Sequence, residues 1–320
     1  MISQTKNYLT KLACAILAMA MSSSVLSQQS AQDLVGQMLT VSMSLNYSGV
    51  FSYESVGTKR NVKVSHQVLD GHAYERILYL DGVPKDRLRK SLVKNCAFGN
   101  SSREFNLQEY YQFNILGEYR VAGRQAYRVQ AMPLDKLRYG YQFGVDQQTG
   151  LMLQSTLLNQ SGQPLEKFKY VDIELEPSPV DSSDIRYLNK FNQIKTETCI
   201  EDEQELTRLI PVKWVAKWVP PGFYRSSQRF IDDNRVSLFY TDGISVFSVL
   251  IDDSPEKLDY GRLSARVGPT QMMTANYRHN GRDYRITVSG QMPQSTVNRI
   301  VLSVRPLAFG QSNPKDSTGQ

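Results

Sequence analysis

Apolar residues recur at helical spacing in two stretches of the chain. The first follows Ser30-Ala31-Gln32-Asp33, which has the form of a helix capping box. Its apolar positions are Leu34, Met38, Val41 and Leu45. The second follows Pro293, and its apolar positions are Val297, Ile300, Val301 and Val304. Residues at this spacing share one face of a helix, so we predict helices over residues 33–46 and 295–304.

Between these two helices the pattern has a period of two, which predicts β-strands. From Tyr47 onward, short alternating segments are separated by turn dipeptides. These are Asp70-Gly71, Asp81-Gly82, Ala122-Gly123, Thr149-Gly150 and Ser161-Gly162. Such short connections join neighbouring antiparallel strands, so we predict a meander.

Residues 139–146 alternate strictly between aromatic or apolar side chains and small or polar ones. Tyr139, Tyr141, Phe143 and Val145 share one strand face, and small or polar residues share the other. Two interpretations of the aromatic face are open. It packs on the first helix, or it lines a hydrophobic groove that binds a ligand.

The C-terminal third again predicts antiparallel strands. Residues 236–240 and 244–251 flank a turn at Asp242-Gly243. Asn280-Gly281 predicts a hairpin with a two-residue turn, which needs positive φ at both positions. That hairpin pairs Tyr277 with Tyr284 and Arg278 with Asp283, two favourable cross-strand matches.

The chain therefore divides into two domains of the α+β class, each mainly antiparallel β. Two prolines interrupt residues 174–184, so we place the first domain at residues 28–180 and a linker at residues 181–210. The second domain takes residues 211–306 and ends with the second helix. Residues 307–320 are polar and aperiodic, and we expect a disordered tail.

The N-terminus has the layout of a secretory signal peptide. Lys6 and Lys11 precede an apolar stretch over residues 12–21, and small residues follow as far as Ser27. We predict cleavage after Ser27. An uncleaved membrane anchor is the alternative, but about ten apolar residues are too few to span a bilayer.

Cleavage leaves two cysteines, Cys96 and Cys199. Three arrangements are open: a disulfide, two buried thiols, or a shared metal ion. Neither cysteine has another cysteine or a histidine within four residues, so the local spacing of zinc sites is absent. We expect a bridge between Cys96 and Cys199, which would close a loop of about 100 residues and stabilise the fold by about 4 to 5 kcal/mol.

Charge and motifs narrow the function classes. The 320 residues include 37 Lys and Arg against 31 Asp and Glu, a net charge of +6, and no long run has one sign, so nucleic-acid binding is disfavoured. The local signatures of hydrolases, metalloproteases, redox enzymes and nucleotide-binding proteins are absent. The acidic pairs Asp232-Asp233 and Asp252-Asp253 are candidate metal ligands, but each follows an isoleucine at an expected strand end, where Asp favours turns, and we favour the turn interpretation. We expect a binding protein with no catalytic residues, cofactor or metal.

Many short motifs, in order along both domains, resemble the RseB/MucB family. In the first domain they are Ile77-Leu78-Tyr79-Leu80-Asp81-Gly82-Val83-Pro84, Arg120-Val121-Ala122-Gly123-Arg124, Arg138-Tyr139-Gly140-Tyr141 and Leu157-Leu158-Asn159. In the second they are Trp218-Val219-Pro220-Pro221-Gly222-Phe223, Tyr240-Thr241-Asp242-Gly243 and Val246-Phe247-Ser248-Val249. The resemblance covers about residues 30–305, and Cys96 and Cys199 look similar to the family's paired cysteines.

The resemblance implies a periplasmic negative regulator of the sigma-E or AlgU envelope stress response. Such proteins bind the periplasmic part of a single-span anti-sigma factor of the RseA/MucA type and protect it from regulated proteolysis. The family's first domain is a half-barrel like that of the lipoprotein carrier LolA, and its groove is thought to sense lipid or misassembled envelope material. The resemblance also implies that the protein is peripheral to the inner membrane, where its partner holds it, and that a homodimer is one possible oligomeric state.

On this basis we predict three sites. A lipid or lipopolysaccharide groove is lined by Phe51, Tyr53, Tyr139, Tyr141 and Phe143. An anion-binding rim contains Arg87, Arg89 and Lys90, with a solvated strand edge as the alternative. The anti-sigma surface includes Tyr277, Arg282, Tyr284 and Arg285. The other candidate function is that of a periplasmic lipid or lipoprotein carrier or chaperone.

Overall fold

A computed structural model describes most of the two predicted domains. The described residues are 30–69, 71–82, 85–92, 106–176, 198–199, 214–232, 234–253 and 262–307. The predicted signal peptide, most of the predicted linker and the predicted tail lie outside them. Within these ranges, every helix is too short or too polar to span a lipid bilayer.

The first sheet has nine antiparallel strands in the order β4-β3-β2-β1-β9-β8-β7-β6-β5. They are β1 (Tyr47–Ser55), β2 (Thr58–Leu69), β3 (His72–Tyr79), β4 (Asp86–Leu92), β5 (Tyr111–Val121), β6 (Arg124–Pro133), β7 (Gly140–Asp146), β8 (Met152–Leu158) and β9 (Pro164–Leu175). A 3₁₀ turn, η1 (Leu107–Glu109), precedes β5. The strands form two meanders that join where β1 pairs with β9, and the predicted meander is confirmed.

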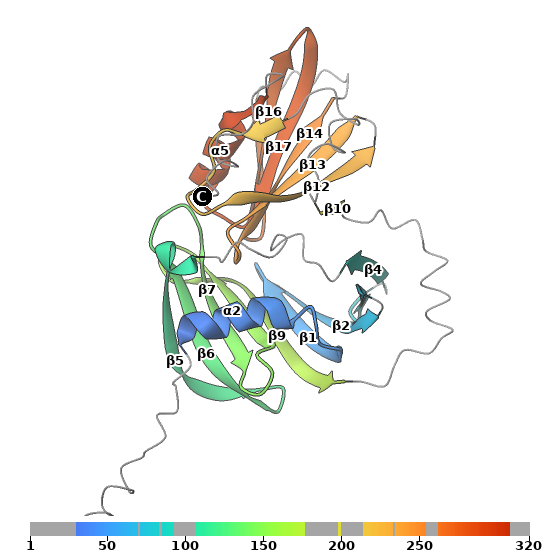
Figure 1. Cartoon of the computed structure of the whole chain (residues 1–320), viewed down its shortest axis with the longest axis vertical. Coiled ribbons are helices and arrows are strands. Elements are labelled where there is room, and N and C mark those ends of the chain that lie inside the picture. The colour runs from blue at the N-terminus through green and yellow to red at the C-terminus, as the bar shows by residue number, and fades with distance from the viewer. Residues whose placement is uncertain are drawn as a thin grey trace, which may run out of the picture. The chain divides into compact units, whose positions relative to one another are not determined.

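Helix α2 (Ala31–Val41) lies across the concave side of this curved sheet (Figure 1). Its buried residues Leu34, Val35 and Met38 pack on Val129 and Phe143 of the sheet. The sheet therefore has the half-barrel form that the resemblance implies. The predicted helix began two residues later and ended five later, because the chain turns after Val41, where the Ser44 amide donates to the Val41 carbonyl.

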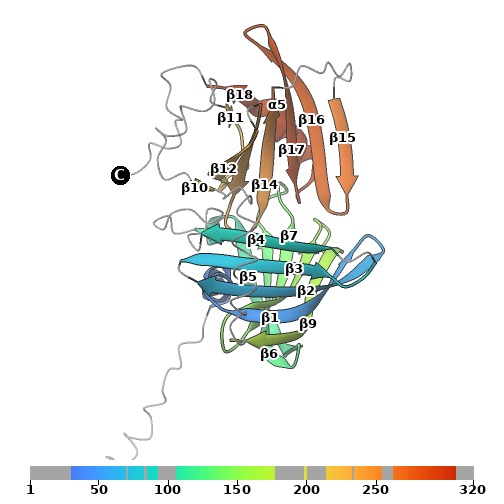
Figure 2. The same ribbon diagram turned by 90° about the vertical axis from the view of Figure 1, so that its right-hand side faces the viewer.

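The second sheet has seven antiparallel strands in the order β10-β12-β13-β14-β17-β16-β15. Figure 2 shows several of them face on. They are β10 (Thr198–Cys199), β12 (Tyr224–Asp232), β13 (Arg235–Thr241), β14 (Val246–Asp252), β15 (Arg262–Val267), β16 (Thr270–His279) and β17 (Arg282–Gly290). A separate pair joins β11 (Trp214–Ala216) to β18 (Val304–Pro306). The fold class of two mainly antiparallel β units with helices is confirmed.

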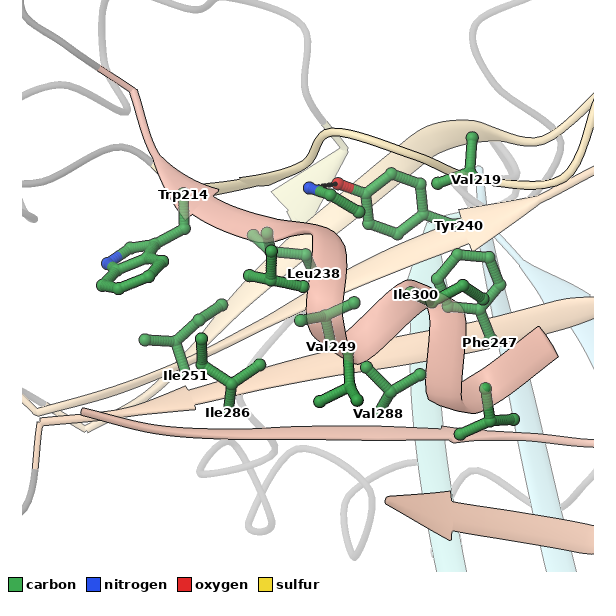
Figure 3. Close-up of a cluster of buried hydrophobic side chains, with 14 of the residues drawn as sticks. Trp214, Val219, Leu238, Tyr240, Phe247, Val249, Ile251, Ile286, Val288 and Ile300 are labelled. Carbon is green, nitrogen blue, oxygen red and sulfur yellow. Dashed lines mark hydrogen bonds between the residues drawn. The ribbon is translucent and has the colours of Figure 1, made fainter. Parts of the chain in front are cut away.

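Helix α5 (Gln294–Ser303) covers one face of the second sheet and contacts β16 and β17. Its apolar stripe is buried as the spacing predicted, and Ile300 lies among sheet residues that include Phe247, Val249 and Val288 (Figure 3). The Ala216 amide donates to the Tyr240 hydroxyl at 3.1 Å, which fastens β11 to the sheet.

The predicted hairpin has the expected register. Tyr277 pairs with Tyr284, and Arg278 pairs with Asp283. Asn280 and Gly281 have φ of 48° and 77°, so both central residues adopt the positive φ that this turn requires.

Candidate functional site

A cavity of about 550 Å³ lies beside helix α2. One wall comes from α2, β7 and β8, and the other comes from residues at the ends of β14, β16 and β17 and from the turn before β14. The lining residues are Met38, Leu39, Ser42, Tyr141, Phe143, Met152, Ser155, Ile244, Val246, Thr270, Gly290 and Gln291. A largely apolar wall with a few hydroxyl and amide groups is typical of small-molecule sites.

Two of the predicted groove residues, Tyr141 and Phe143, form part of this wall. Their rings stack with centroids 5.4 Å apart and an interplanar angle of 10°. The Tyr141 hydroxyl lies 3.2 Å from the Ser245 hydroxyl, within hydrogen-bond distance. Burial raises the pKa of the Tyr141 hydroxyl above its ordinary value.

The aromatic strand face packs on helix α2 and also borders the cavity, and ligand binding there stays a prediction. Phe143 is 4% exposed and packs on the buried face of α2, and its ring also borders the cavity. The interpretation as helix packing and the interpretation as a groove describe two sides of one aromatic cluster.

The other predicted groove residues lie elsewhere in the first sheet. Phe51 packs on Phe168, with ring centroids 4.6 Å apart, and Tyr139 is 8% exposed. The Tyr53 hydroxyl donates to Glu166 Oε2 at 2.6 Å, and burial, followed by that hydrogen bond, raises the pKa of Tyr53 to about 12. None of these three residues lines the cavity.

A buried arginine lies just before β7, close in sequence to the aromatic pair. Arg138 is 0% exposed, and its Nη1 donates to Asp242 Oδ2 in the turn before β14 at 2.5 Å. Its Nη2 donates to the Pro221 carbonyl at 2.5 Å and to Asp135 Oδ2 at 3.0 Å. The guanidinium carbon also lies 5.1 Å from the centroid of the Phe223 ring.

Asp242 shares its carboxylate between this contact and its own turn. Oδ1 accepts the amides of Ile244 at 3.0 Å and Ser245 at 2.7 Å, the usual role of Asp at the first position of a turn. Oδ2 also accepts the Tyr111 hydroxyl at 2.8 Å. Burial, and then the Asp242 charge, raise the pKa of Tyr111 well above its ordinary value. The turn thus holds Ile244 in the cavity wall.

A second polar contact joins the first sheet to the residue after β17. Glu166 Oε2 accepts Gln291 Nε2 at 2.9 Å in addition to the Tyr53 hydroxyl. Gln291 borders the cavity. Arg138, Asp242 and Glu166 are therefore among the polar groups that join the two walls of the cavity.

The predicted anion-binding rim lies on β4, away from the cavity lining. Arg87 is exposed, with its guanidinium carbon 6.0 Å from the centroid of the Tyr79 ring. Arg89 and Lys90 are opposite Glu75 and Tyr74 in the strand register. Whether these residues bind anions stays a prediction.

Some residues of the predicted anti-sigma surface face the core, and others face solvent. Tyr284 is 6% exposed and packs on Trp214, so little of its side chain faces solvent, and its part in anti-sigma binding stays a prediction. Tyr277 is half-buried against the same tryptophan. Arg282 is exposed and pairs with Asp253 at 3.3 Å, whereas the Arg285 side chain is 25% exposed. Alternation along the hairpin places its tyrosines on the face toward the core.

The predicted disulfide stays a prediction. Cys96 lies outside the described residues. Cys199 belongs to β10, opposite Ser227 of β12, and only its backbone is described.

Sequence reasoning did not single out Arg138, Asp242 or Glu166 as site residues. Arg138 and Asp242 both stood inside motifs, but they are 104 residues apart and their pairing follows from tertiary structure. The usable signal was an arginine directly before an aromatic strand, since a buried arginine needs charged and carbonyl partners.

Comparisons with known proteins match nearly the whole described chain. The family model for the MucB/RseB N-terminal domain matches residues 30–193, and the one for the MucB/RseB C-terminal domain matches residues 210–305. Sigma factor AlgU regulatory protein MucB of Pseudomonas aeruginosa is 30% identical over 301 residues, which cover 88% of this chain and 92% of the relative. Sigma-E factor regulatory protein RseB of Haemophilus influenzae is 26% identical over 309 residues, which cover 86% of this chain and 91% of the relative.

Solved structures give the same result. A chain of the Pseudomonas aeruginosa MucA/MucB complex has a TM-score of 0.63 and 27% identity, over 87% of this chain and 99% of that one. The crystal structure of MucB has a TM-score of 0.60 and 26% identity, over 87% of this chain and 98% of that one.

Proposed function

The chain belongs to the MucB/RseB family, and on this premise we propose that it binds the periplasmic domain of a membrane-spanning anti-sigma factor. By doing so it regulates a sigma factor of the sigma-E or AlgU type. The observation that carries the proposal is the match of 87% of the chain to a chain of the MucA/MucB complex, at a TM-score of 0.63. A regulatory binding role needs no catalytic residues.

The proposed compartment is the periplasm. The signal-peptide pattern of residues 1–27 supports export, and the protein would then reach the inner membrane through its partner. The proposed mature chain begins at Gln28.

We further propose that the bound chain shields the anti-sigma factor from proteolysis and releases it when lipid binds. The cavity between α2 and the turn before β14 is the candidate lipid site, because its wall is mainly apolar and comes from both sheets. A ligand there would contact Ile244 and Met38 together, so it would bias the arrangement of the two walls. Because the two binding equilibria are linked, lipid and the anti-sigma factor would each lower the affinity for the other by the same factor. A coupling free energy of about 1 to 3 kcal/mol corresponds to an affinity change of about 5- to 150-fold.

The test of binding uses the mature chain and the purified periplasmic domain of the anti-sigma factor from the same organism. Calorimetric titration should give saturable binding. The anti-sigma domain in the complex should also resist the protease that cleaves the free domain. Absence of binding by the folded chain would contradict the proposed function.

A lipid titration separates regulator from carrier. If the chain is a regulator, added lipopolysaccharide should displace the anti-sigma domain. A carrier would retain lipid or lipoprotein from a periplasmic extract and would not bind the anti-sigma domain. Mass spectrometry of the retained material distinguishes the two.

A further inference from the structure

Strand β15 (Arg262–Val267) is the last strand of the second sheet, and all six of its residues are exposed. It pairs antiparallel with β16, from Arg262 opposite Ala275 to Val267 opposite Thr270. Among the described residues, no strand pairs with its other side. Such an edge presents backbone donors and acceptors that can pair with a further strand.

One face of this edge is apolar. Leu263, Ala265 and Val267 alternate along β15, so they share a sheet face, and the register places Met272 opposite Ala265 on that face. Leu263 is 48% exposed, Val267 is 75% exposed and Met272 is 39% exposed. Natural edge strands commonly avoid exposed apolar rows, because such rows promote association.

The other face of the edge is basic. Arg262 and Arg266 alternate with the apolar residues, and their register partners Ala275 and Gln271 are uncharged. β15 and β16 together contain no acidic residue. A strand that adds here would meet apolar side chains on one face and positive charge on the other.

A neighbouring turn extends the apolar surface. Val56 has φ of 42°, which is unusual for a β-branched residue, and it is 72% exposed. Its Cγ2 lies 3.9 Å from the position that a Cβ on Gly268 would occupy. Val56, in the turn between β1 and β2, therefore lies near Gly268, which follows the end of β15. Val267, the last residue of β15, is also exposed there.

We propose that β15 binds an extended peptide segment of the anti-sigma partner, in which acidic residues alternate with apolar ones. The peptide would add an eighth strand, place its apolar side chains on Leu263 and Val267, and direct its carboxylates to Arg262 and Arg266. A second copy of this chain fits the edge less well, since antiparallel pairing would bring two more arginines to the same face. This inference rests on the proposed function and names its contact surface.

The test compares two double variants of the mature chain. Leu263→Glu/Val267→Glu puts two negative charges on the apolar face of the edge. Leu116→Glu/Val171→Glu is the matched control, because Leu116 is 47% exposed and Val171 is 61% exposed on the first sheet. Titration with the anti-sigma periplasmic domain should give at least about tenfold weaker binding for the β15 variant, equivalent to about 1.4 kcal/mol, and unchanged binding for the control.

Hydrogen exchange and charge reversal supply independent measurements. Backbone amides of β15 should gain protection when the anti-sigma domain binds, since a new strand would pair with them. Arg262→Glu/Arg266→Glu should weaken binding, and that effect should diminish at high salt.

Several results would overturn the inference. If the wild-type chain binds the anti-sigma domain and the Leu263→Glu/Val267→Glu variant binds equally well, the edge is not the contact, although the proposed function stands. If that variant instead converts a wild-type dimer to a monomer without weakening anti-sigma binding, the occupant is a second copy. If the wild-type chain does not bind the domain at all, both the proposed function and this inference fail.

Discussion

Arg138 and Asp242 form an ion pair in which neither side chain is exposed to solvent. Arg138 precedes β7 of the first sheet, and Asp242 lies in the turn before β14 of the second. The pair therefore links the aromatic wall of the cavity to the turn that carries Ile244. The Tyr111 hydroxyl, the Pro221 carbonyl and Asp135 make further hydrogen bonds to the pair, which is the arrangement that a buried charge requires.

Replacing Arg138 with methionine should strongly destabilise the protein. Arg138→Met leaves the Asp242 carboxylate buried without its cationic partner, and breaking such a pair costs about 3 to 5 kcal/mol. Urea unfolding measures the change in free energy. Arg138→Met/Asp242→Asn should recover part of the loss, because the uncompensated charge is gone.

The matched control is an exposed ion pair on the first sheet. Arg76 and Asp86 are 2.7 Å apart, with side chains 51% and 44% exposed. Arg76→Met should cost less than about 1 kcal/mol, since solvent screens such pairs. Equal losses for the two arginines would show that burial of Arg138 has no special energetic role.

Asp146 should make the free energy of unfolding depend on pH in the acid range. Its burial disfavours the charged form, but hydrogen bonds from Arg124 Nε at 2.7 Å and from Thr149 outweigh burial and lower the pKa of Asp146. A lowered native pKa means that the unfolded state binds more protons, so this contribution is present above about pH 4 and is lost as pH falls further. Asp146→Asn should remove that part of the pH dependence in unfolding curves measured from pH 7 to pH 2. An unchanged acid limb in the variant would contradict this assignment.

Gly222 should tolerate alanine poorly. It has φ of 87°, and a Cβ there would lie 2.6 Å from Cε2 of Tyr110, whose ring adjoins Arg138. Gly222→Ala therefore adds a steric clash to the backbone penalty. Gly71 has φ of 71° with nothing within 4 Å of its Cβ position, so Gly71→Ala measures the backbone penalty by itself. Thermal unfolding should show the larger loss for Gly222→Ala.

Filling the cavity should uncouple lipid from anti-sigma binding. Ser155→Phe places a ring in the cavity wall, whereas Ser161→Phe adds the same ring at an exposed turn. The ratio of anti-sigma affinities without and with lipopolysaccharide should fall toward one in Ser155→Phe and keep its wild-type value in Ser161→Phe. If both variants keep the wild-type ratio, lipid acts at another site.

The local elements of the fold could be read from the sequence. Strand alternation, Gly-containing turns and the two apolar helical stripes depend on neighbours within a few residues, so the meander, helix α5 and the Asn280-Gly281 hairpin were predictable. The end of α2 was predicted too late, because Leu45 remains in the core after the chain has left the helix. Apolar spacing does not distinguish a helix from a turn that continues the same buried face.

The candidate site was predictable only in part. Of the residues on the aromatic strand face, Tyr141 and Phe143 line the cavity and Tyr139 does not, whereas Phe51 and Tyr53 belong to β1, outside the cavity lining. The burial of Tyr284 could not be read from the sequence, because a tyrosine pair that stabilises a hairpin can face either solvent or the core. The contacts of Arg138 with Asp242 and of Glu166 with Gln291 join residues more than 100 positions apart, and one sequence carries no record of such pairing.

This chain, as we propose, binds the periplasmic domain of an anti-sigma factor, and lipid opposes this binding. Calorimetric titration of the mature chain with that domain, with and without lipopolysaccharide, tests it most directly. We predict saturable binding without lipid and about 5- to 150-fold weaker binding with lipid. A folded chain that binds lipid but gives no anti-sigma binding under either condition would contradict the claim and favour a carrier.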